Sequence, residues 1–429
     1  MSQCGSIPSV SVQAPGVQRP VQRAVHRHSA DYRGDIDGLR AVAVTLVVLF
    51  HVGSSVLPGG FVGVDVFYVI SGFLITGLLV RELRSSGTLS ITNFYARRVR
   101  RLLPLSALVL VTTAIASRFL APVLDRPGIG SDIRAAATYM ANWHYAAAST
   151  QYMASTGKSP VLHYWSLSVE EQFYVLWPLL LLLASIGAAR RSWQVGRRRI
   201  VVTLGALGVA SLTLSIVTTA DSGPFAFFGL HTRAWEMAVG AGLSLMTDQR
   251  LRKSARWSIF LGWIGLLMIL ASAGLLSGDT PYPGSAAVLP VLGTAMLLAS
   301  GAAQSSWSVG RLLSLPPVRY LGRISYAWYL WHWPLLSMVR IAQFGERNLP
   351  VDIAVGLLSL AMAAATFYLV ERPIRRWRQA NVRPLGWRPV FVGAAVCAAV
   401  AYSMARSRAS CKAPVRSNAA SNCAREILS

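Results

Sequence analysis

A histidine lies near the end of a long apolar run, where an ionisable side chain is unusual. The stretch "IDGLRAVAVTLVVLFHVG" covers residues 36–53, and a single threonine is the only polar residue between Arg40 and His51. Eleven helical steps of about 100° bring His51 to within about 20° of Arg40 and about 16 Å further along the axis. If the helix begins early enough, Asp37 lies within about 40° of that face. The spacing predicts a polar stripe through Asp37, Arg40 and His51.

A histidine in hydrocarbon must find a partner or line a cavity, so His51 is a functional candidate. Neutral imidazole can take a proton from a hydroxyl and return it, which suits acyl transfer. The competing interpretation is a buried histidine that joins two helices by a hydrogen bond. Arg40 is the weaker candidate, because an arginine at an inner helix end often just extends to the lipid headgroups.

Four arginines precede the third apolar run, in "NFYARRVRRLLP": Arg97, Arg98, Arg100 and Arg101. Guanidinium groups bind phosphate in a bidentate fork, so a cytoplasmic cofactor that carries phosphate could dock here. The alternative, which the cluster alone favours, is a positive anchor that contacts anionic lipid.

Carboxylates also occur within apolar segments. "HYWSLSVEEQFYVLWPLL" contains Glu170 and Glu171, which point about 100° apart on a helix, so one of them is expected to face the interior with Ser166. That carboxylate could orient an acceptor hydroxyl or the histidine. Asp65, in "VGVDVFYV", is expected to have a cationic partner, because an unpaired carboxylate in a bilayer is unfavourable.

Other ionisable groups favour structural roles. Arg233 and Glu236, three residues apart, predict an ion pair on one helix face. His332 lies in the aromatic segment "RISYAWYLWHWPLL", where packing is favoured over a second functional histidine. The four cysteines match no metal-site spacing and no H-E-x-x-H motif occurs, so no metal is expected.

The composition indicates a membrane protein. Of 429 residues, 53% are hydrophobic and 14% charged, whereas soluble domains are about 25% charged. Eleven apolar runs are candidate spans of a bilayer core about 30 Å thick. The fold class is therefore an all-α polytopic membrane protein with 10 or 11 transmembrane helices, at 39–57, 61–80, 102–121, 162–186, 200–219, 228–247, 257–277, 285–301, 324–342, 351–370 and 389–405.

The charge distribution predicts the orientation. The formal charge is +24, and most of the 41 Lys and Arg residues fall in alternate loops, which predicts a cytoplasmic N-terminus. Nucleic-acid binding is not expected, because no base-reading motif accompanies the charge. The expected organisation is a disordered arm, a membrane domain, an additional helix and a short extracytoplasmic tail, at 1–33, 34–380, 381–405 and 406–429.

Glycines occur at positions 59, 60, 63 and 72, just before and within the second span. A glycine lets two helices approach closely, and it also permits the backbone to unwind. The sequence leaves both interpretations open.

Six motifs, in this order, resemble the acyltransferase 3 family of integral membrane proteins, which includes bacterial O-antigen and peptidoglycan O-acetyltransferases. They are "DIDGLRAVAVTLVVLFH", "GGFVGVDVFYVISGFLIT", "FYARRVRRLLP", "YWSLSVEEQFYVLWP", "ISYAWYLWHWPL" and "ERPIRR", within about residues 33–380. The resemblance implies a catalytic histidine at His51, ten residues after Arg40. It also implies an R-x-x-R element linked to acyl-CoA, matched by Arg97 with Arg100 or by Arg98 with Arg101.

The expected function follows from this resemblance and the polar stripe. An acyl group, acetyl in the first place, would pass from acyl-CoA to a hydroxyl of a cell-envelope glycan or glycolipid at the cytoplasmic membrane. His51 would act as base or nucleophile, Arg40 and Asp37 would position or polarise the reactants, and Glu170 would assist. Longer family members continue into an extracytoplasmic hydrolase-like (SGNH) domain. This domain is expected to be absent, so that the membrane domain or a separate extracytoplasmic protein completes the transfer.

Two alternatives use the same residues without chemistry. A transporter or flippase for an acyl group, lipid or glycan would use the polar stripe and the glycines as a pathway. A scaffold for envelope-synthesis partners would tolerate the loss of His51 and Arg40. Release of free CoA distinguishes the enzyme from both.

Overall fold

The computed structural model describes residues 32–150, 152–153, 159–185, 193–246, 255–301 and 305–374. These residues form helices and connections, with no strand among them. The α-helices are α2 (Gly34–Val52), α3 (Gly63–Ser86), α4 (Ile91–Leu120), α5 (Arg126–Ala137), α6 (Ala141–Ala147), α7 (Tyr164–Ser185), α8 (Trp193–Asp221), α9 (Gly223–Phe228), α10 (Leu230–Met246), α11 (Ala255–Leu275), α12 (Val288–Ser300), α13 (Val309–Leu313), α14 (Pro316–Ala342) and α15 (Leu349–Thr366).

The chain is an all-α, multi-pass membrane protein. Each of the first ten predicted spans overlaps one of these helices, and six helices of the described part are long and apolar enough to cross a bilayer. Helices α2, α10 and α14 bury ionisable residues, and α12 is a shorter apolar helix. Residues 1–31, the predicted eleventh span and the predicted tail lie outside the described residues.

The first predicted span is shifted along the chain. Helix α2 begins at Gly34 and has Asp35 and Asp37 in its first turn, where negative charge interacts favourably with the helix dipole. It ends at Val52, because Gly53 adopts a left-handed conformation with φ of 94°. The predicted end at residue 57 was therefore wrong, and His51 lies in the last turn of the helix.

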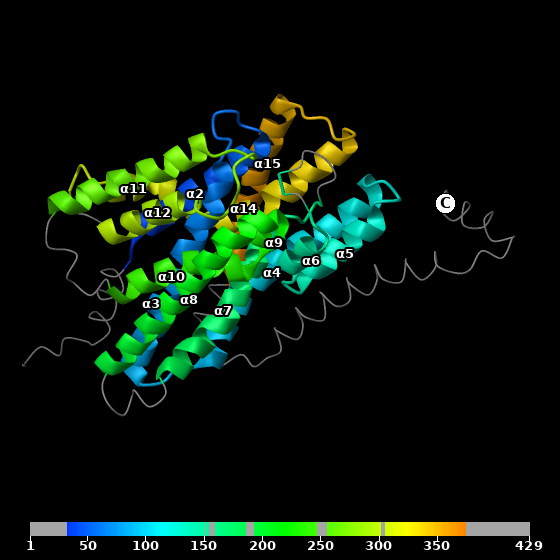
Figure 1. Ribbon diagram of the computed structural model, residues 1–429. Coiled ribbons are helices and arrows are strands. Elements are labelled where there is room, and N and C mark those ends of the chain that lie inside the picture. Colours follow the sequence, from blue (N-terminus) through cyan, green and yellow to red (C-terminus); the bar gives the residue numbers. More distant parts are fainter. Residues whose placement is uncertain are drawn as a thin grey trace, which may run out of the picture.

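Helix α2 lies in the interior of the bundle, along α14 and against α3 (Figure 1). Figure 1 shows α11 and α12 at one edge of the bundle and α5 and α6 at the other. The close approach of α2 and α14 requires a glycine, because a Cβ atom at Gly322 would lie 1.7 Å from the Asp37 carbonyl oxygen. This contact holds the two histidine-bearing helices together.

The glycines at positions 59, 60, 63 and 72 mediate close packing. A Cβ atom at Gly59, Gly60, Gly63 or Gly72 would lie between 1.9 and 2.5 Å from a carbonyl oxygen of another helix. Gly72 of α3 faces the Met237 carbonyl of α10 in this way. Small residues at such positions let backbones approach closely, and this packing interpretation is confirmed.

Replacing Gly72 with alanine is expected to destabilise the protein by about 1–3 kcal/mol, the usual effect of overpacking a close contact. The added methyl group would lie 1.9 Å from the Met237 carbonyl oxygen, so α3 and α10 must separate. Thermal unfolding in detergent measures the effect. Gly242→Ala on α10 is the matched control, because nothing lies within 4 Å of its Cβ position. Equal melting temperatures for the two variants would contradict the packing argument.

Helices α3, α4 and α7 meet at mid-length. The Tyr164 hydroxyl donates to the Ser106 carbonyl and the Tyr95 hydroxyl to the Val175 carbonyl, which aligns α4 antiparallel to α7. Contacts of Tyr68 with the Ser166 carbonyl and of Trp177 with the Thr76 hydroxyl align α3 parallel to α7. This register brings polar residues from the middle of each helix to one place.

Candidate active site

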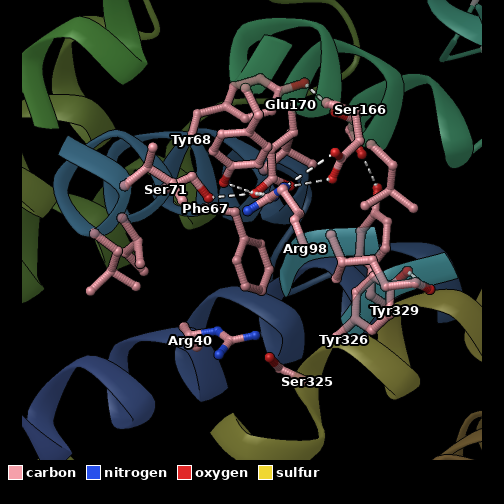
Figure 2. Close-up of a pocket in the computed structure, with 18 of the residues that line it drawn as sticks. Arg40, Phe67, Tyr68, Ser71, Arg98, Ser166, Glu170, Ser325, Tyr326 and Tyr329 are labelled. Carbon is pink, nitrogen blue, oxygen red and sulfur yellow. Dashed lines mark hydrogen bonds and ion pairs between the residues drawn. The ribbon is translucent and has the colours of Figure 1, made fainter. Parts of the chain in front are cut away.

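A cavity lined by both apolar and polar side chains lies among α2, α3, α4, α7 and α14. Figure 2 shows Arg40 and Ser325 on one side, Ser71, Ser166 and Glu170 on the other, and Arg98 between them. The polar residues that line it include Arg40, Tyr68, Ser71, Arg98, Arg101, Ser166, Glu170, Glu171, Tyr174, Ser325, Tyr326 and Tyr329. Three arginines and two carboxylates thus face one space.

Arg98 joins the two carboxylates of α7. Its Nε donates to Glu171 at 3.1 Å, and its terminal nitrogen lies 3.6 Å from Glu170. Its guanidinium also stacks on the Tyr174 ring, and Glu170 accepts hydrogen bonds from Ser71 and Tyr174. The prediction that only one of the two glutamates faces the interior was wrong, because both line the cavity. Although Glu170 and Glu171 point about 100° apart on α7, the Arg98 guanidinium lies between them and contacts both.

The four arginines near the start of α4 separate into two pairs. Arg98 and Arg101 line the cavity. Arg97 pairs with Glu82 at 3.3 Å, and Arg100 donates to the Ala96 carbonyl of its own helix. Of the two R-x-x-R registers left open by the sequence, the one formed by Arg98 and Arg101 faces the space available to a ligand.

Arg40 and Asp37 have different environments. Arg40 lines the cavity and makes no hydrogen bond or ion pair with any other described residue. Asp37 instead accepts a hydrogen bond from the Tyr32 hydroxyl and lies 3.8 Å from the Arg323 guanidinium. Its carboxylate is engaged there rather than with Arg40 or His51.

His51 is 6% exposed and contacts groups from two other segments. Its Nδ1 lies 3.1 Å from Nε2 of His332 on α14, and its Nε2 lies 3.0 Å from the Tyr152 hydroxyl. An imidazole next to a hydroxyl can exchange a proton with it. Neither His332 nor Tyr152 was singled out as a partner of His51 from the sequence. For His332 the available signal was an ionisable residue inside an apolar segment, the same signal that identified His51.

Tyr152 lies in the connection between α6 and α7, outside the spanning helices. Its ring stacks on Phe227 and meets Trp165 edge-on. Burial among these rings raises the pKa of Tyr152, so its hydroxyl keeps its proton at physiological pH.

Two hydroxyl groups that line the cavity lie near the histidines. The Tyr329 hydroxyl lies 2.5 Å from Ser166 Oγ and donates to the His163 carbonyl. Both Tyr329 and Ser166 line the cavity, and the Tyr329 ring centroid lies 5.3 Å from that of His332. We call the contact between Tyr329 and Ser166 the hydroxyl partition.

Asp65 has the cationic partner that was expected. Arg233 of α10 donates to Asp65 at 2.9 Å and to Glu236 at 3.1 Å, so the predicted pair of Arg233 and Glu236 is also present. All three residues are at most 1% exposed. We call them the α3–α10 charge cluster. Its geometry favours a structural role, because each charge is directed at another member.

Among the described residues, no group of three or more His, Cys, Asp or Glu side chains could hold a metal ion. The four cysteines lie outside those residues.

Comparisons with known proteins identify the family. The profile of the family described as "Acyltransferase domain" matches residues 33–370. The chain is 31% identical to the peptidoglycan O-acetyltransferase OatA of Listeria monocytogenes over 82% of this chain and 57% of that protein. It is 29% identical to a protein provisionally named an O-acetyltransferase in Staphylococcus aureus (strain MSSA476), over 84% of this chain and 60% of that protein.

A third relative is provisionally named the peptidoglycan O-acetyltransferase YrhL of Bacillus subtilis and is 29% identical over 80% of this chain and 55% of that protein. The chain thus spans less than two thirds of the length of these curated relatives. No solved structure matches it. Because the family profile covers most of the chain, including every residue of the cavity and of the histidine contacts, the chain belongs to the acyltransferase domain family.

Proposed function

We propose that this protein is an O-acyltransferase that moves an acyl group, acetyl in the first place, from acyl-CoA to a hydroxyl of a cell-envelope glycan. The observation that carries the proposal is the buried His51, whose Nε2 lies 3.0 Å from the Tyr152 hydroxyl. The same helix carries Arg40, which lines a cavity together with Arg98 and Arg101. Family membership supports the reaction class. The multi-pass fold and the basic inner loops support the cytoplasmic membrane of a bacterium as its location.

The proposed chemistry needs one base and one acid. Nε2 of His51 takes the proton of the acceptor hydroxyl while the hydroxyl oxygen attacks the thioester carbonyl carbon. The carbon–sulfur bond breaks, and the imidazolium returns the proton to the CoA sulfur. In the alternative form, Nε2 attacks the carbonyl first and carries the acyl group to the acceptor. Both forms give one ester and one free thiol.

The cavity supports binding of a negatively charged donor. Arg98 is held by two carboxylates, whereas Arg40 makes no ion pair with any described residue and therefore contributes positive charge to the cavity. Arg101 faces the same space and is the proposed phosphate ligand. Arg40, on the wall formed by α2 and about 16 Å from His51 along the helix, is proposed to position the donor rather than to contact its reacting carbonyl. Glu170 is the proposed orienting carboxylate. Asp37, which is engaged with Tyr32, is proposed only to position α2.

Replacing Arg101 with glutamine is expected to raise the KM for acetyl-CoA about tenfold, because a charge-assisted hydrogen bond contributes about 1.5–3 kcal/mol. The kcat should change much less, since the phosphates are remote from the reacting carbonyl. Arg97→Gln is the matched control, because Arg97 is on the same helix and pairs with Glu82 away from the cavity. A larger rise in KM for Arg97→Gln than for Arg101→Gln would contradict this assignment.

The acceptor is proposed from the relatives' names. Two of them are named as peptidoglycan O-acetyltransferases, so a peptidoglycan hydroxyl is the first acceptor to try, and a glycolipid is the second. A separate extracytoplasmic protein is a further proposed partner, for the final transfer.

The proposal is tested with the purified full chain in lipid vesicles. Acetyl-CoA labelled in its acetyl group is supplied on the side that carries the basic loops, and both the released thiol and the label on peptidoglycan fragments are measured. Thiol release with acceptor labelling supports the enzyme. Movement of label across the vesicle without thiol release would indicate a carrier and overturn the proposal.

A further inference from the structure

A chain of hydrogen-bonding groups connects His51 to a backbone carbonyl of α14. The Tyr152 hydroxyl contacts Nε2 of His51, and Nδ1 of His51 contacts Nε2 of His332. Nδ1 of His332 then lies 3.3 Å from the Trp328 carbonyl, four residues earlier on the same helix. Each imidazole thus uses both of its nitrogens in this chain.

The Trp328 carbonyl, at the end of this chain of groups, determines which atom donates in each hydrogen bond. A carbonyl oxygen only accepts, so Nδ1 of His332 must carry a proton. In a neutral imidazole the other nitrogen is then an acceptor, which leaves Nε2 of His332 to accept from Nδ1 of His51. Nε2 of His51 consequently has its lone pair available, directed towards the hydroxyl of Tyr152.

Helix α14 also holds the main chain of His51. The Arg340 guanidinium donates to the His51 carbonyl at 2.6 Å and to Asp352 of α15 at 2.8 Å. The rings of His51 and His332 stack with centroids 5.1 Å apart, and the Trp333 ring lies 4.6 Å from His51. One helix therefore contacts both the carbonyl and the ring of His51.

We propose that His332 is a positioning residue that fixes the tautomer of His51, with the proton on Nδ1 and the lone pair on Nε2. This inference rests on the proposed function of His51 as base or nucleophile, because only then does the tautomer affect the reaction. In the other tautomer Nε2 would carry a proton and could not accept one from a hydroxyl. His332 does not touch the reacting atoms in this scheme and acts through His51.

The kinetic test compares two replacements of His332 in the full chain in lipid. A glutamine offers an amide oxygen that can accept from Nδ1 of His51, whereas leucine offers no acceptor. For His332→Leu we expect kcat to fall about a hundredfold, at the lower end of what a general base contributes, with KM for acetyl-CoA little changed. His332→Gln should recover at least a tenth of the wild-type kcat. Equal kcat values for the two variants would overturn the proposal.

A second measurement reads the tautomer without activity. In protein labelled with ¹⁵N on the histidine rings, assigned through His51→Gln, the His51 Nδ1 should show the shift of a protonated nitrogen and Nε2 that of an unprotonated one. His332→Leu should mix or reverse these shifts, and His332→Gln should preserve them. A protonated Nε2 in the wild type would overturn the proposal. If the shifts are as expected but His51→Gln retains full transfer, the tautomer assignment stands and the proposed function of His51 fails.

Discussion

The His51→Ala variant is expected to lose acyl transfer by a factor of about 10²–10⁴, the contribution usual for a general acid–base residue. The replacement removes the imidazole that contacts both the Tyr152 hydroxyl and His332, at 3.0 and 3.1 Å. The loss should appear in kcat, because the donor cavity is lined by other residues and keeps its arginines. Thiol release and acceptor labelling in vesicles measure it.

His144→Ala is the matched control for this experiment. His144 belongs to α6, where it pairs with Asp132 at 2.8 Å and lies outside both the cavity and the histidine contacts. Its replacement should leave kcat within about twofold of the wild type, since a surface ion pair contributes about 0–1 kcal/mol. Full transfer by His51→Ala, with the control equally active, would exclude His51 as base and as nucleophile.

Replacing Arg233 with methionine is expected to destabilise the protein by about 3–5 kcal/mol, the usual effect of removing one partner from a buried ion pair. Asp65 and Glu236 would be left together without a cation in the interior of the α3–α10 interface. Methionine fills a similar volume, so the loss of charge rather than a cavity causes the effect. Unfolding in detergent, followed by temperature or denaturant, measures the change.

A compensated variant separates charge from packing. Arg233→Met combined with Asp65→Asn and Glu236→Gln removes all three charges of the α3–α10 charge cluster and should recover most of the lost stability, because neutral buried groups lack the penalty of an isolated charge. If the triple variant were no more stable than Arg233→Met, the cluster would contribute through shape or specific hydrogen bonds rather than through charge balance.

The fold was predictable because a bilayer imposes a length and a composition on each crossing helix. Apolar runs therefore located ten helices of the described part. Close packing, one of the two roles that the sequence left open for the glycines in and before α3, was also found. The end of α2 was misplaced, since the run of apolar residues continues beyond Gly53 while the backbone turns there. Hydropathy reports what a residue prefers to contact, and a helix end depends on a single backbone conformation.

The site was less predictable. Arg40 and His51 lie on one helix, α2, as the apolar run predicted, because that relation is local. The contact between His51 and His332 joins residues 281 positions apart, and no local pattern encodes it. The same limit explains the error over Glu170 and Glu171: an isolated helix suggests that they diverge, but Arg98 from α4 reaches both. Which two of the four arginines face the cavity depends on how α4 is oriented about its axis, and the sequence alone does not give that orientation.

The hydroxyl partition has a consequence for the membrane itself. In the proposed orientation the donor cavity faces the cytoplasm, and His51 lies about 16 Å from Arg40 along α2, towards the opposite side. An uninterrupted watery path between them would conduct protons and dissipate the electrochemical gradient across the bilayer. We propose that Tyr329 and Ser166, whose oxygens lie 2.5 Å apart, interrupt such a path where the cavity approaches His332. The hydroxyl partition would therefore limit proton leakage between the two sides of the membrane while an acyl group is transferred.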